Sequence, residues 1–407
     1  MSRLAVWMYG TKIGTLQRSR GALAFSYTDE ALELGAGRPL LSVSMPTRAG
    51  AYRGRTPEAF FDGLLPEGEA RKMIAYDFRV ADEAFALLSV LGRDCAGALT
   101  VVPDADGPQP DGLPEPIDEI EVGRRLRNLP VHPLGVDDKV RASLAGMQQK
   151  LLLARLGDGW GLPVNGAPST HILKPPSRDV GFPDLIVNEA FCLRVGRHLG
   201  LEVAEAEIGE FDGVPALIIE RFDRTAPDAE GKVSRTHQED FCQAHGIDGS
   251  YTGKYESSGG PSLRQCATLL GRWSREAHAL ERLLDAATLT VLVGNADGHG
   301  KNLSLLHSRE GAIRLAPVYD VFSSLWYPEH SVEPGMRVNG VADIGAVSRD
   351  DLIAEAASWG LRRDAAATRL EELLSQADDA IAHAADELGP PQSLVELLQA
   401  RARALRT

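Results

Sequence analysis

The stretch "GNADGHGKNLSL" (294–305) gathers side chains that could do chemistry. A carboxylate, an imidazole, an amine and two carboxamides stand within eight positions, directly before an apolar, strand-like run: Asn295, Asp297, His299, Lys301 and Asn302. Asn, Asp and Gly also favour turns for purely local reasons, so a polar turn after a helix is the alternative interpretation. His299 has no second histidine at H-x-x-H or H-x-x-x-H spacing, which argues against a zinc site.

A second carboxylate strengthens the case for a site. Two apolar-alternating runs flank "HSREG" (307–311), and this predicts a hairpin that returns Asp320 to Asp297 and Asn302. Two carboxylates and a carboxamide suit Mg²⁺, which commonly keeps substrate phosphates as further ligands. Asp297 and Asn302 are five residues apart, like the proton-accepting Asp and metal-binding Asn of protein-kinase catalytic loops. The pattern predicts phosphoryl transfer, with Lys301 available as a point charge on the transferring group.

A kinase also needs a cation on the inner phosphates of the nucleotide, set on a strand. Lys174 fits, because it ends the apolar run "STHILKPP" (169–176), although an ordinary strand-end lysine would look the same. Glu189, on a predicted helix over 183–201, could orient this lysine through an ion pair, but most helical glutamates are simply solvated.

Two further stretches could contact a nucleotide. "SLAGMQQK" (143–150) could offer backbone N–H groups to phosphate, but its single glycine, Gly146, makes it a weak glycine-rich loop. "IIERFDR" (218–224) ends an apolar strand in a burst of charge. That pattern is typical of a hinge to a second lobe, with backbone groups that could meet an adenine edge, and an ordinary strand end would look similar.

The composition limits the classes of function. The 407 residues are 43% hydrophobic and 25% charged, which is ordinary for a globular protein. The net charge of −14 argues against holding nucleic acid by bulk electrostatics and favours a basic protein partner. The cysteines are far apart, which argues against structural zinc and suits a reducing cytoplasm: Cys95, Cys192, Cys242 and Cys266. No signal peptide and no run of 18 apolar residues is evident, so we expect no membrane span.

The periodicity of apolar residues predicts an α+β protein. Strands around Gly10 in 4–17, a strand over 39–46 and helices over 67–78 and 81–92 indicate a small N-terminal module. A Pro- and Asp-rich segment over 103–116 reads as a loop or linker. Strand-like runs then flank a single helix, which predicts an antiparallel-rich lobe: strands 150–156, 169–176, 202–211 and 214–222, and helix 183–201. From about residue 238 the pattern becomes helical, interrupted by the hairpin, with helices over 261–274, 276–295, 364–388 and 393–405.

The fragments, in their order along nearly the full chain, resemble the HipA family of bacterial serine/threonine kinase toxins of toxin–antitoxin pairs. Those that look like the family's N-terminal module are "FFDGLLPEG" (60–68) and "FALLSVLGRDCAGAL" (85–99). Those that look like its kinase core are "SLAGMQQK", "STHILKPP", "ERFDR", "QEDFCQ" (238–243), "KYESSGGPS" (254–262), "DGHGKN" and "YDVFS" (319–323). Two positions depart from the pattern: Gln149 stands where the family often has Glu, and Val-Phe follows Asp320 where eukaryotic kinases have Phe-Gly.

The resemblance implies roles for individual residues. Asp297 would be the catalytic base, and Asn302 and Asp320 would bind Mg²⁺. The residues implied to contact ATP are Lys174 and Gly146, with His299 and Lys301 near the phosphates, Glu220 and Phe222 at the adenine hinge, and Gln238 and Tyr319 nearby. Ser143 matches the family's autophosphorylated serine. A phosphate there would bring about −1.5 to −2 charges beside those of ATP, so we expect it to expel the loop and abolish ATP binding.

The resemblance also implies an organisation and partners. We expect a two-lobed protein-kinase-like fold, with a β-rich N-terminal lobe that carries an added module and a helical C-terminal lobe. The predicted segments are a module over 1–102, a linker over 103–120, a kinase N-lobe over 121–222 and a C-lobe over 223–407. The expected partners of this cytoplasmic enzyme are a small helix-turn-helix antitoxin, operator DNA mainly through that antitoxin, and a protein substrate in translation, such as a translation factor or an aminoacyl-tRNA synthetase.

Two other functions remain open at the level of sequence. The chain could be a nucleotide-binding co-repressor subunit that acts through complex formation on an operator, although the intact Asp297 and Asn302 count against this. It could instead be a kinase-fold enzyme for a small molecule, which has no evident need for the N-terminal module or for Ser143.

Overall fold

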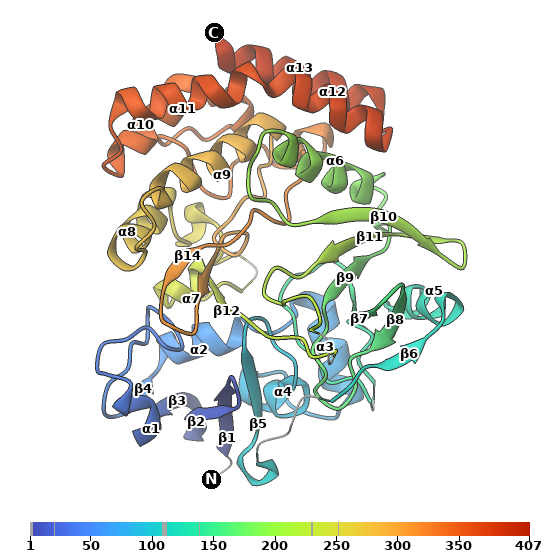
Figure 1. The fold of residues 1–407 in the computed structure, drawn as a ribbon, viewed down its shortest axis with the longest axis vertical. Helices are drawn as coiled ribbons and strands as arrows, with labels where there is room; N and C mark the ends of the chain where they lie inside the picture. The colour runs from blue at the N-terminus through green and yellow to red at the C-terminus, as the bar shows by residue number, and fades with distance from the viewer. Residues whose placement is uncertain (1–2, 20, 108–111, 138, 229–230, 251) are drawn as a thin grey trace. The chain divides into compact units, whose positions relative to one another are not determined.

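The computed structural model describes residues 3–19, 21–107, 112–137, 139–228, 231–250 and 252–407 (Figure 1). The chain divides into two compact units. Unit 1 comprises residues 1–175, 209–253 and 306–311, and unit 2 comprises residues 176–208, 254–305 and 312–407. The four segments expected from the sequence stay a prediction. Within the described ranges, no helix combines the length and the apolar character that crossing a membrane requires.

The N-terminal part of unit 1, up to β5, is an antiparallel sheet that shares a hydrophobic core with four helices. Its strands lie in the order β4-β3-β2-β1-β5: β1 (Arg3–Met8), β2 (Thr11–Ser19), β3 (Ala22–Tyr27), β4 (Tyr52–Arg53) and β5 (Leu99–Pro103). Tyr9 and Gly10 both have positive φ, as a two-residue hairpin turn requires, so the hairpin predicted over 4–17 is confirmed. The helices are α1 (Asp29–Glu33), α2 (Arg55–Asp62), α3 (Gly68–Asp77) and α4 (Ala84–Leu91). Phe25, Phe60 and Phe61 are fully buried between these elements.

The strand predicted over 39–46 is wrong. The alternation of apolar and polar residue types suggested a strand, but Ser42 is buried together with Leu41 and Val43. The backbone does not pair with a neighbouring strand, however. The Val43 N–H donates to the Glu239 carboxylate at 2.9 Å, and the Met45 N–H donates to the Ser42 carbonyl in a turn.

The second half of unit 1 is a sheet in the order β10-β11-β9-β7-β8-β6. Its strands are β6 (Glu115–Ile117), β7 (Leu151–Leu156), β8 (Gly159–Leu162), β9 (His171–Lys174), β10 (Ala206–Phe211) and β11 (Val214–Glu220). The β11–β9, β9–β7, β7–β8 and β8–β6 pairs are antiparallel, which confirms the antiparallel-rich lobe. An unpredicted helix, α5 (Glu119–Asn128), buries Val122 and Leu126 in this lobe's core. The loop predicted over 103–116 is wrong at its end, where β6 forms, and residues 108–111 lie outside the described residues.

Two shorter elements complete unit 1. Helical structure was expected from residue 238, but the strand β12 (His237–Asp240) forms first and is followed by α7 (Phe241–His245). Asp240 ends the strand by capping this helix, because its side chain accepts the Gln243 N–H while the Gln243 side chain accepts the Asp240 N–H.

Unit 2 is mainly helical, as predicted. Its longer helices are α6 (Leu185–His198), α8 (Leu263–Trp273), α9 (Ala279–Val293), α10 (Arg349–Ser358), α11 (Arg363–Ser375), α12 (Ala377–Leu388) and α13 (Gln392–Arg406). The helices α10, α11 and α13 pack on α9, whose apolar residues are largely buried (Figure 1). The single helix predicted over 364–388 is two helices that meet at Gln376, and α10 was not predicted. Strands β13 (Ser304–His307) and β14 (Ile313–Leu315) are neighbours, which confirms the predicted hairpin, and residues 306–311 of this hairpin are assigned to unit 1. The mixed α+β fold class is therefore confirmed.

Candidate active site

The loop that follows α9 in unit 2 is held by its own polar groups. Gly294 ends the helix with φ 69°, and a Cβ on it would lie 2.6 Å from Leu325, so glycine is required there. The Asn295 Oδ1 accepts the Asp297 N–H at 3.0 Å. The Asn302 Nδ2 donates to the Asp297 carbonyl at 3.0 Å, across the five-residue step that the sequence singles out. Base and metal ligand of the predicted site are thus fixed relative to one another by the backbone of the loop.

Asp297 is oriented by a residue that sequence reasoning did not assign. The Tyr255 hydroxyl donates to Asp297 Oδ1 at 2.6 Å, and the Tyr255 ring meets the His299 ring edge-on, with centroids 5.1 Å apart. The Gly300 N–H donates to the Lys254 carbonyl at 3.2 Å, so the segment around Tyr255 is bound to the loop at two points. The Asp297 side chain is 39% exposed, whereas His299 is buried. The carboxylate is therefore both positioned and accessible.

The segment after the hairpin brings Tyr319 to this loop, while the approach of Asp320 to Asp297 and Asn302 stays a prediction. The Tyr319 hydroxyl donates to the Lys301 carbonyl at 2.6 Å and lies 2.6 Å from Ser304 Oγ. Asp320 has φ 54°, in the left-handed region that a residue with a Cβ rarely adopts. Such strain persists where the surroundings enforce it and is concentrated at functional sites. A cavity of about 30 Å³ lies behind the loop, lined by Asn295, His299 and Tyr319 among mainly apolar residues, and it has room for one or two water molecules.

The donor set of unit 2 fits a hard divalent cation. No group of three or more His, Cys, Asp or Glu residues that could hold a metal occurs in the described part of the chain. The residues expected to bind the metal, Asp297, Asp320 and Asn302, carry side-chain oxygens that could serve as ligands, and three such ligands would leave coordination positions to substrate phosphates and water. That is the kind of site that Mg²⁺ prefers, so the residues present fit the ion expected from the sequence.

The residues predicted to contact the nucleotide from unit 1 lie on its second sheet and the adjoining loop. Lys174 is the last residue of β9, is 5% exposed and pairs in register with Leu217 of β11. Glu220 ends β11 and is exposed, and Phe222 is half-buried. Glu189 lies on α6 of unit 2 and is buried. Its ion pair with Lys174 stays a prediction.

Gln238 lies on β12 between two buried, anchored neighbours. The Glu239 carboxylate binds the His307 Nε2 at 2.9 Å as well as the Val43 N–H, and His237 Nε2 lies 2.7 Å from the Leu41 carbonyl. Burial, reinforced by the charge of His307, lowers the pKa of His237 to about 3, so this ring is neutral at physiological pH. Gln238 itself is half-buried.

The loop predicted to hold phosphate is folded inward. Ser143 is fully buried, its hydroxyl donates to the Leu64 carbonyl at 2.7 Å, and its N–H donates to the Asp94 carbonyl at 2.9 Å. Gly146 has φ 111°, and a Cβ there would lie 2.5 Å from Lys150 Nζ, so glycine is needed for conformation and for space. Both ends of the loop are therefore tied within unit 1.

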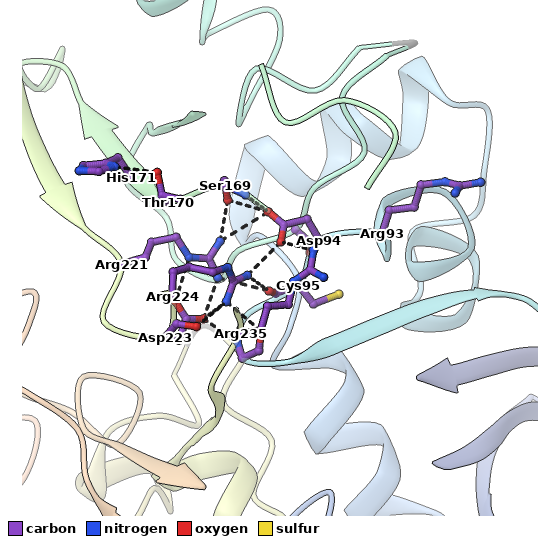
Figure 2. Close-up of polar contacts among 12 residues, drawn as sticks. Arg93, Asp94, Cys95, Ser169, Thr170, His171, Arg221, Asp223, Arg224 and Arg235 are labelled. Carbon is purple, nitrogen blue, oxygen red and sulfur yellow. Dashed lines mark hydrogen bonds and ion pairs between the residues drawn. The ribbon is translucent and has the colours of Figure 1, made fainter. Parts of the chain in front are cut away.

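A buried charge cluster in unit 1 was missed entirely (Figure 2). It comprises Asp94, Ser169, Arg221, Asp223, Arg224 and Arg235, which come from parts of the sequence up to 141 residues apart. Asp94, Arg221 and Asp223 are at most 3% exposed. Burial alone would raise the pKa of the Asp94 carboxyl, but the charges of Arg224, Arg221 and Arg235 outweigh it and hold that pKa below its usual range. The one local signal was the alternation of charges in "ERFDR", in which Arg221 and Asp223 face inward and Glu220 outward.

Comparisons with known proteins show to which family the chain belongs. The family model described as the HipA N-terminal domain matches residues 4–102, and the model described as the HipA-like C-terminal domain matches residues 142–381. A putative kinase of Sinorhizobium fredii is 39% identical over 393 residues, which cover 94% of this chain and 92% of that protein. The serine/threonine-protein kinase toxin HipA of Shewanella oneidensis is 30% identical over 336 residues, 79% of this chain and 76% of that one.

A solved structure is similar over almost the whole chain. It is the complex of HipA, HipB and operator DNA from Shewanella oneidensis, with a TM-score of 0.83 and 28% identity, covering 99% of this chain and 95% of that chain. The resemblance inferred from the ordered fragments is thereby confirmed, and with it the assignment of the chain as a kinase.

Proposed function

Because the chain belongs to the HipA family and is a protein serine/threonine kinase, we propose that it transfers the γ-phosphoryl group of ATP to a serine or threonine hydroxyl with the help of Mg²⁺. Asp297 would accept the proton of the attacking hydroxyl, and Asn302 and Asp320 would hold the metal ion. Lys174, Gly146, Glu220, Phe222, Gln238, His299, Lys301 and Tyr319 would bind the nucleotide. The observation that carries this proposal is the orientation of Asp297 by Tyr255 and Asn302 at a half-exposed position.

The chemistry asked of these side chains is mainly positioning. The Tyr255 hydroxyl fixes one oxygen of the Asp297 carboxylate, and the second oxygen would accept the proton. The Asn302 amide group is anchored through Nδ2, and its oxygen would be the metal ligand. Asn302 and Asp320 would hold the metal ion, which would supply positive charge beside the transferring phosphoryl group.

We further propose that phosphorylation of Ser143 switches the kinase off. The Ser143 hydroxyl is buried and donates to a carbonyl, so it can receive a phosphoryl group only after the loop has left this position. A phosphate with about −1.5 to −2 charges would place oxygens against the Leu64 carbonyl, which offers no donor. The loop could not return, and its backbone would no longer be available to ATP.

Partners are proposed from similarity and charge. The similar Shewanella chain was solved with HipB and operator DNA, which supports a small DNA-binding antitoxin for this chain and contact with DNA mainly through it. The net charge of −14 suits a basic partner. As a toxin of such a pair, the enzyme would act in the cytoplasm and inhibit growth by phosphorylating a protein of translation, such as an aminoacyl-tRNA synthetase.

The direct test is phosphotransfer. Purified protein is incubated with ATP and Mg²⁺, phosphorylated residues are mapped by mass spectrometry, and the wild type is compared with Asp297→Asn and Ser143→Ala. We expect phosphate on Ser143 in the wild type, none in Asp297→Asn, and retained activity toward other acceptors in Ser143→Ala. A wild type without phosphotransfer, or an Asp297→Asn variant with full activity, would remove the proposed mechanism; phosphate mainly elsewhere would remove the switch role of Ser143.

A second candidate function is that of a nucleotide-binding co-repressor, favoured by the operator complex of the similar structure. Growth on expression without the antitoxin separates the two. A kinase toxin predicts growth arrest by the wild type and none by Asp320→Ala. If the wild type and Asp320→Ala are equally harmless, and each still strengthens repression of the operator, the result supports the co-repressor function.

A further inference from the structure

Residues 94–97 of the N-terminal module contact three separate parts of the kinase lobe within unit 1. They lie between α4 and β5, outside the segments expected to touch ATP. Asp94 and Cys95 are buried, and burial raises the pKa of the Cys95 thiol to about 12, so it is chemically inert. What this turn offers to the lobe is a carboxylate and a set of backbone groups.

The first contact is with the loop that contains Ser143. The Asp94 carbonyl accepts the Ser143 N–H at 2.9 Å, and Asp94 and Ala142 form an isolated parallel bridge. The far end of the loop is tied to another part of the module by a second bridge, between Gly146 and Pro66. The loop is thus held at its start by the Asp94 turn.

The second contact is with the segment that leads into β9. Asp94 Oδ2 accepts both the N–H of Ser169, at 3.0 Å, and its hydroxyl, at 2.6 Å. The neighbouring Thr170 continues the ladder, since its N–H donates to the Leu153 carbonyl and its carbonyl accepts the Arg221 N–H. The strand that begins here ends at Lys174, so the carboxylate fixes the origin of the strand that carries the proposed phosphate-binding lysine.

The third contact is with the hinge segment that follows β11. Arg224 Nη2 donates to Asp94 Oδ1 at 2.9 Å and to the Cys95 carbonyl at 2.9 Å, and its Nη1 donates to the Gly97 carbonyl at 2.9 Å. The Gly97 N–H donates to Asp223 Oδ2 at 2.7 Å. Figure 2 shows the Asp94 side chain facing Ser169 and Arg224, while the preceding residue, Arg93, points away from the cluster.

In the hinge segment (220–224), buried residues alternate with more exposed ones. Arg221 and Asp223 are buried and bind each other at 2.8 Å, while Glu220 is exposed and Phe222 half-buried. Gly97 packs closely against β12: a Cβ on it would lie 2.6 Å from the backbone N atom of Gln238, so glycine is needed at this position. Residues 94–97 therefore contact the Ser143 loop, the segment that leads into β9, the hinge segment and β12, which are the parts of unit 1 proposed to bind ATP.

We infer that Asp94 is a positioning residue for ATP: through Ser169, Arg224 and its own carbonyl it sets the relative places of the phosphate loop, of β9 and of the hinge. This inference rests on the proposed nucleotide-binding role of those elements. It assigns the N-terminal module a part in nucleotide binding that it performs without touching the nucleotide. Charge-assisted hydrogen bonds in a buried network act as a unit, so loss of one carboxylate displaces all three elements together.

The test compares Asp94→Asn with the wild type for ATP binding by calorimetry in Mg²⁺ and for the rate of autophosphorylation at saturating ATP. The asparagine keeps the shape but presents an NH₂ group to donors, so we expect the Kd for ATP to rise about tenfold or more. The saturated rate should not fall, because Asp297 and its surroundings in unit 2 are unaltered. Hydrogen exchange should increase in residues 142–150 and 220–224 and stay unchanged in β1–β3.

A matched control separates positioning from general destabilisation. Leu16→Ala truncates a fully buried core residue of the same module, away from the cluster. At a similar loss of thermal stability it should leave the Kd for ATP within about twofold of the wild type. If Asp94→Asn does not fold, Ser169→Ala serves instead, since it removes one donor to Asp94 and leaves the arginines paired.

Two results would overturn the inference: an unchanged Kd in both Asp94→Asn and Ser169→Ala, or an equal rise in Leu16→Ala. A wild type that binds no ATP would overturn the proposed function itself, which is a distinguishable outcome.

Discussion

The loop over 294–302 and the Asp94 cluster are both rich in charged and polar side chains, yet they use them in opposite ways. In the loop the groups are close in sequence, and Asp297 stays 39% exposed with one oxygen bound by Tyr255. In the cluster the groups come from distant segments, and both oxygens of Asp94 are occupied by donors. Groups that react must remain accessible, whereas groups that position must be saturated and buried, because an unpaired buried charge is costly.

The largest effect should come from the reactive region. Asp297→Asn removes the proposed base and keeps the shape, so we expect the phosphotransfer rate to fall about 10³-fold with an unchanged melting temperature. The control is Asp285→Asn, a carboxylate on α9 that binds Arg369 and lies outside the loop. A rate loss in the control as large as that in Asp297→Asn would mean that the loop is not the reactive region.

The positioning region should show its effect in stability. Arg224→Met leaves Asp94 and Asp223 buried with one fewer cation, so the free energy of unfolding should fall by about 3–5 kcal/mol in chemical denaturation. Arg369→Met breaks a partly exposed pair with Asp285 and should cost about 1 kcal/mol or less. Equal losses in the two variants would contradict the distinction between a buried cluster and an ordinary ion pair.

A smaller effect is expected from the hydrogen bond by which Tyr255 orients the proposed base, Asp297. Tyr255→Phe keeps the ring contact with His299 but removes the donor to Asp297, so the rate should fall about tenfold. Tyr52→Phe, which loses a hydrogen bond to the Pro46 carbonyl in unit 1, should leave the rate unchanged, and an equal loss of rate in both variants would contradict the role of Tyr255.

The last effect concerns the pH dependence of stability and does not involve the rate. His237 is neutral when folded, with a pKa of about 3, and in the unfolded chain its pKa is that of an ordinary histidine, about 6.5. The unfolded state therefore binds the extra proton between these values, so this contribution is complete above pH 6.5 and is lost as the pH falls toward 3. His237→Gln should reduce the slope of unfolding free energy against pH in that window by at most about 1.4 kcal/mol per unit. An unchanged slope would show that His237 is not buried as a neutral ring.

The sequence predicted what is local. The hairpin over 4–17, the helices α6, α8 and α9, the β13–β14 hairpin and the crowding around Asp297 all follow from patterns within about 25 residues. The missed features depend on contacts across the chain. Residues 39–46 alternate like a strand, but their backbone binds Glu239, nearly 200 residues away. Tyr255 gains its role from Asp297, 42 residues on, and Asp94 from Ser169 and Arg224, so no local pattern marks them.

The measurement that tests the comparison most directly is a pair of constants, the Kd for ATP and the saturated autophosphorylation rate, in wild type, Asp297→Asn and Asp94→Asn. Separate roles predict that Asp297→Asn keeps the Kd and loses the rate, while Asp94→Asn raises the Kd about tenfold and does not lower the rate. If both variants change the same constant to a similar extent, the division between a reactive loop and a positioning cluster is wrong.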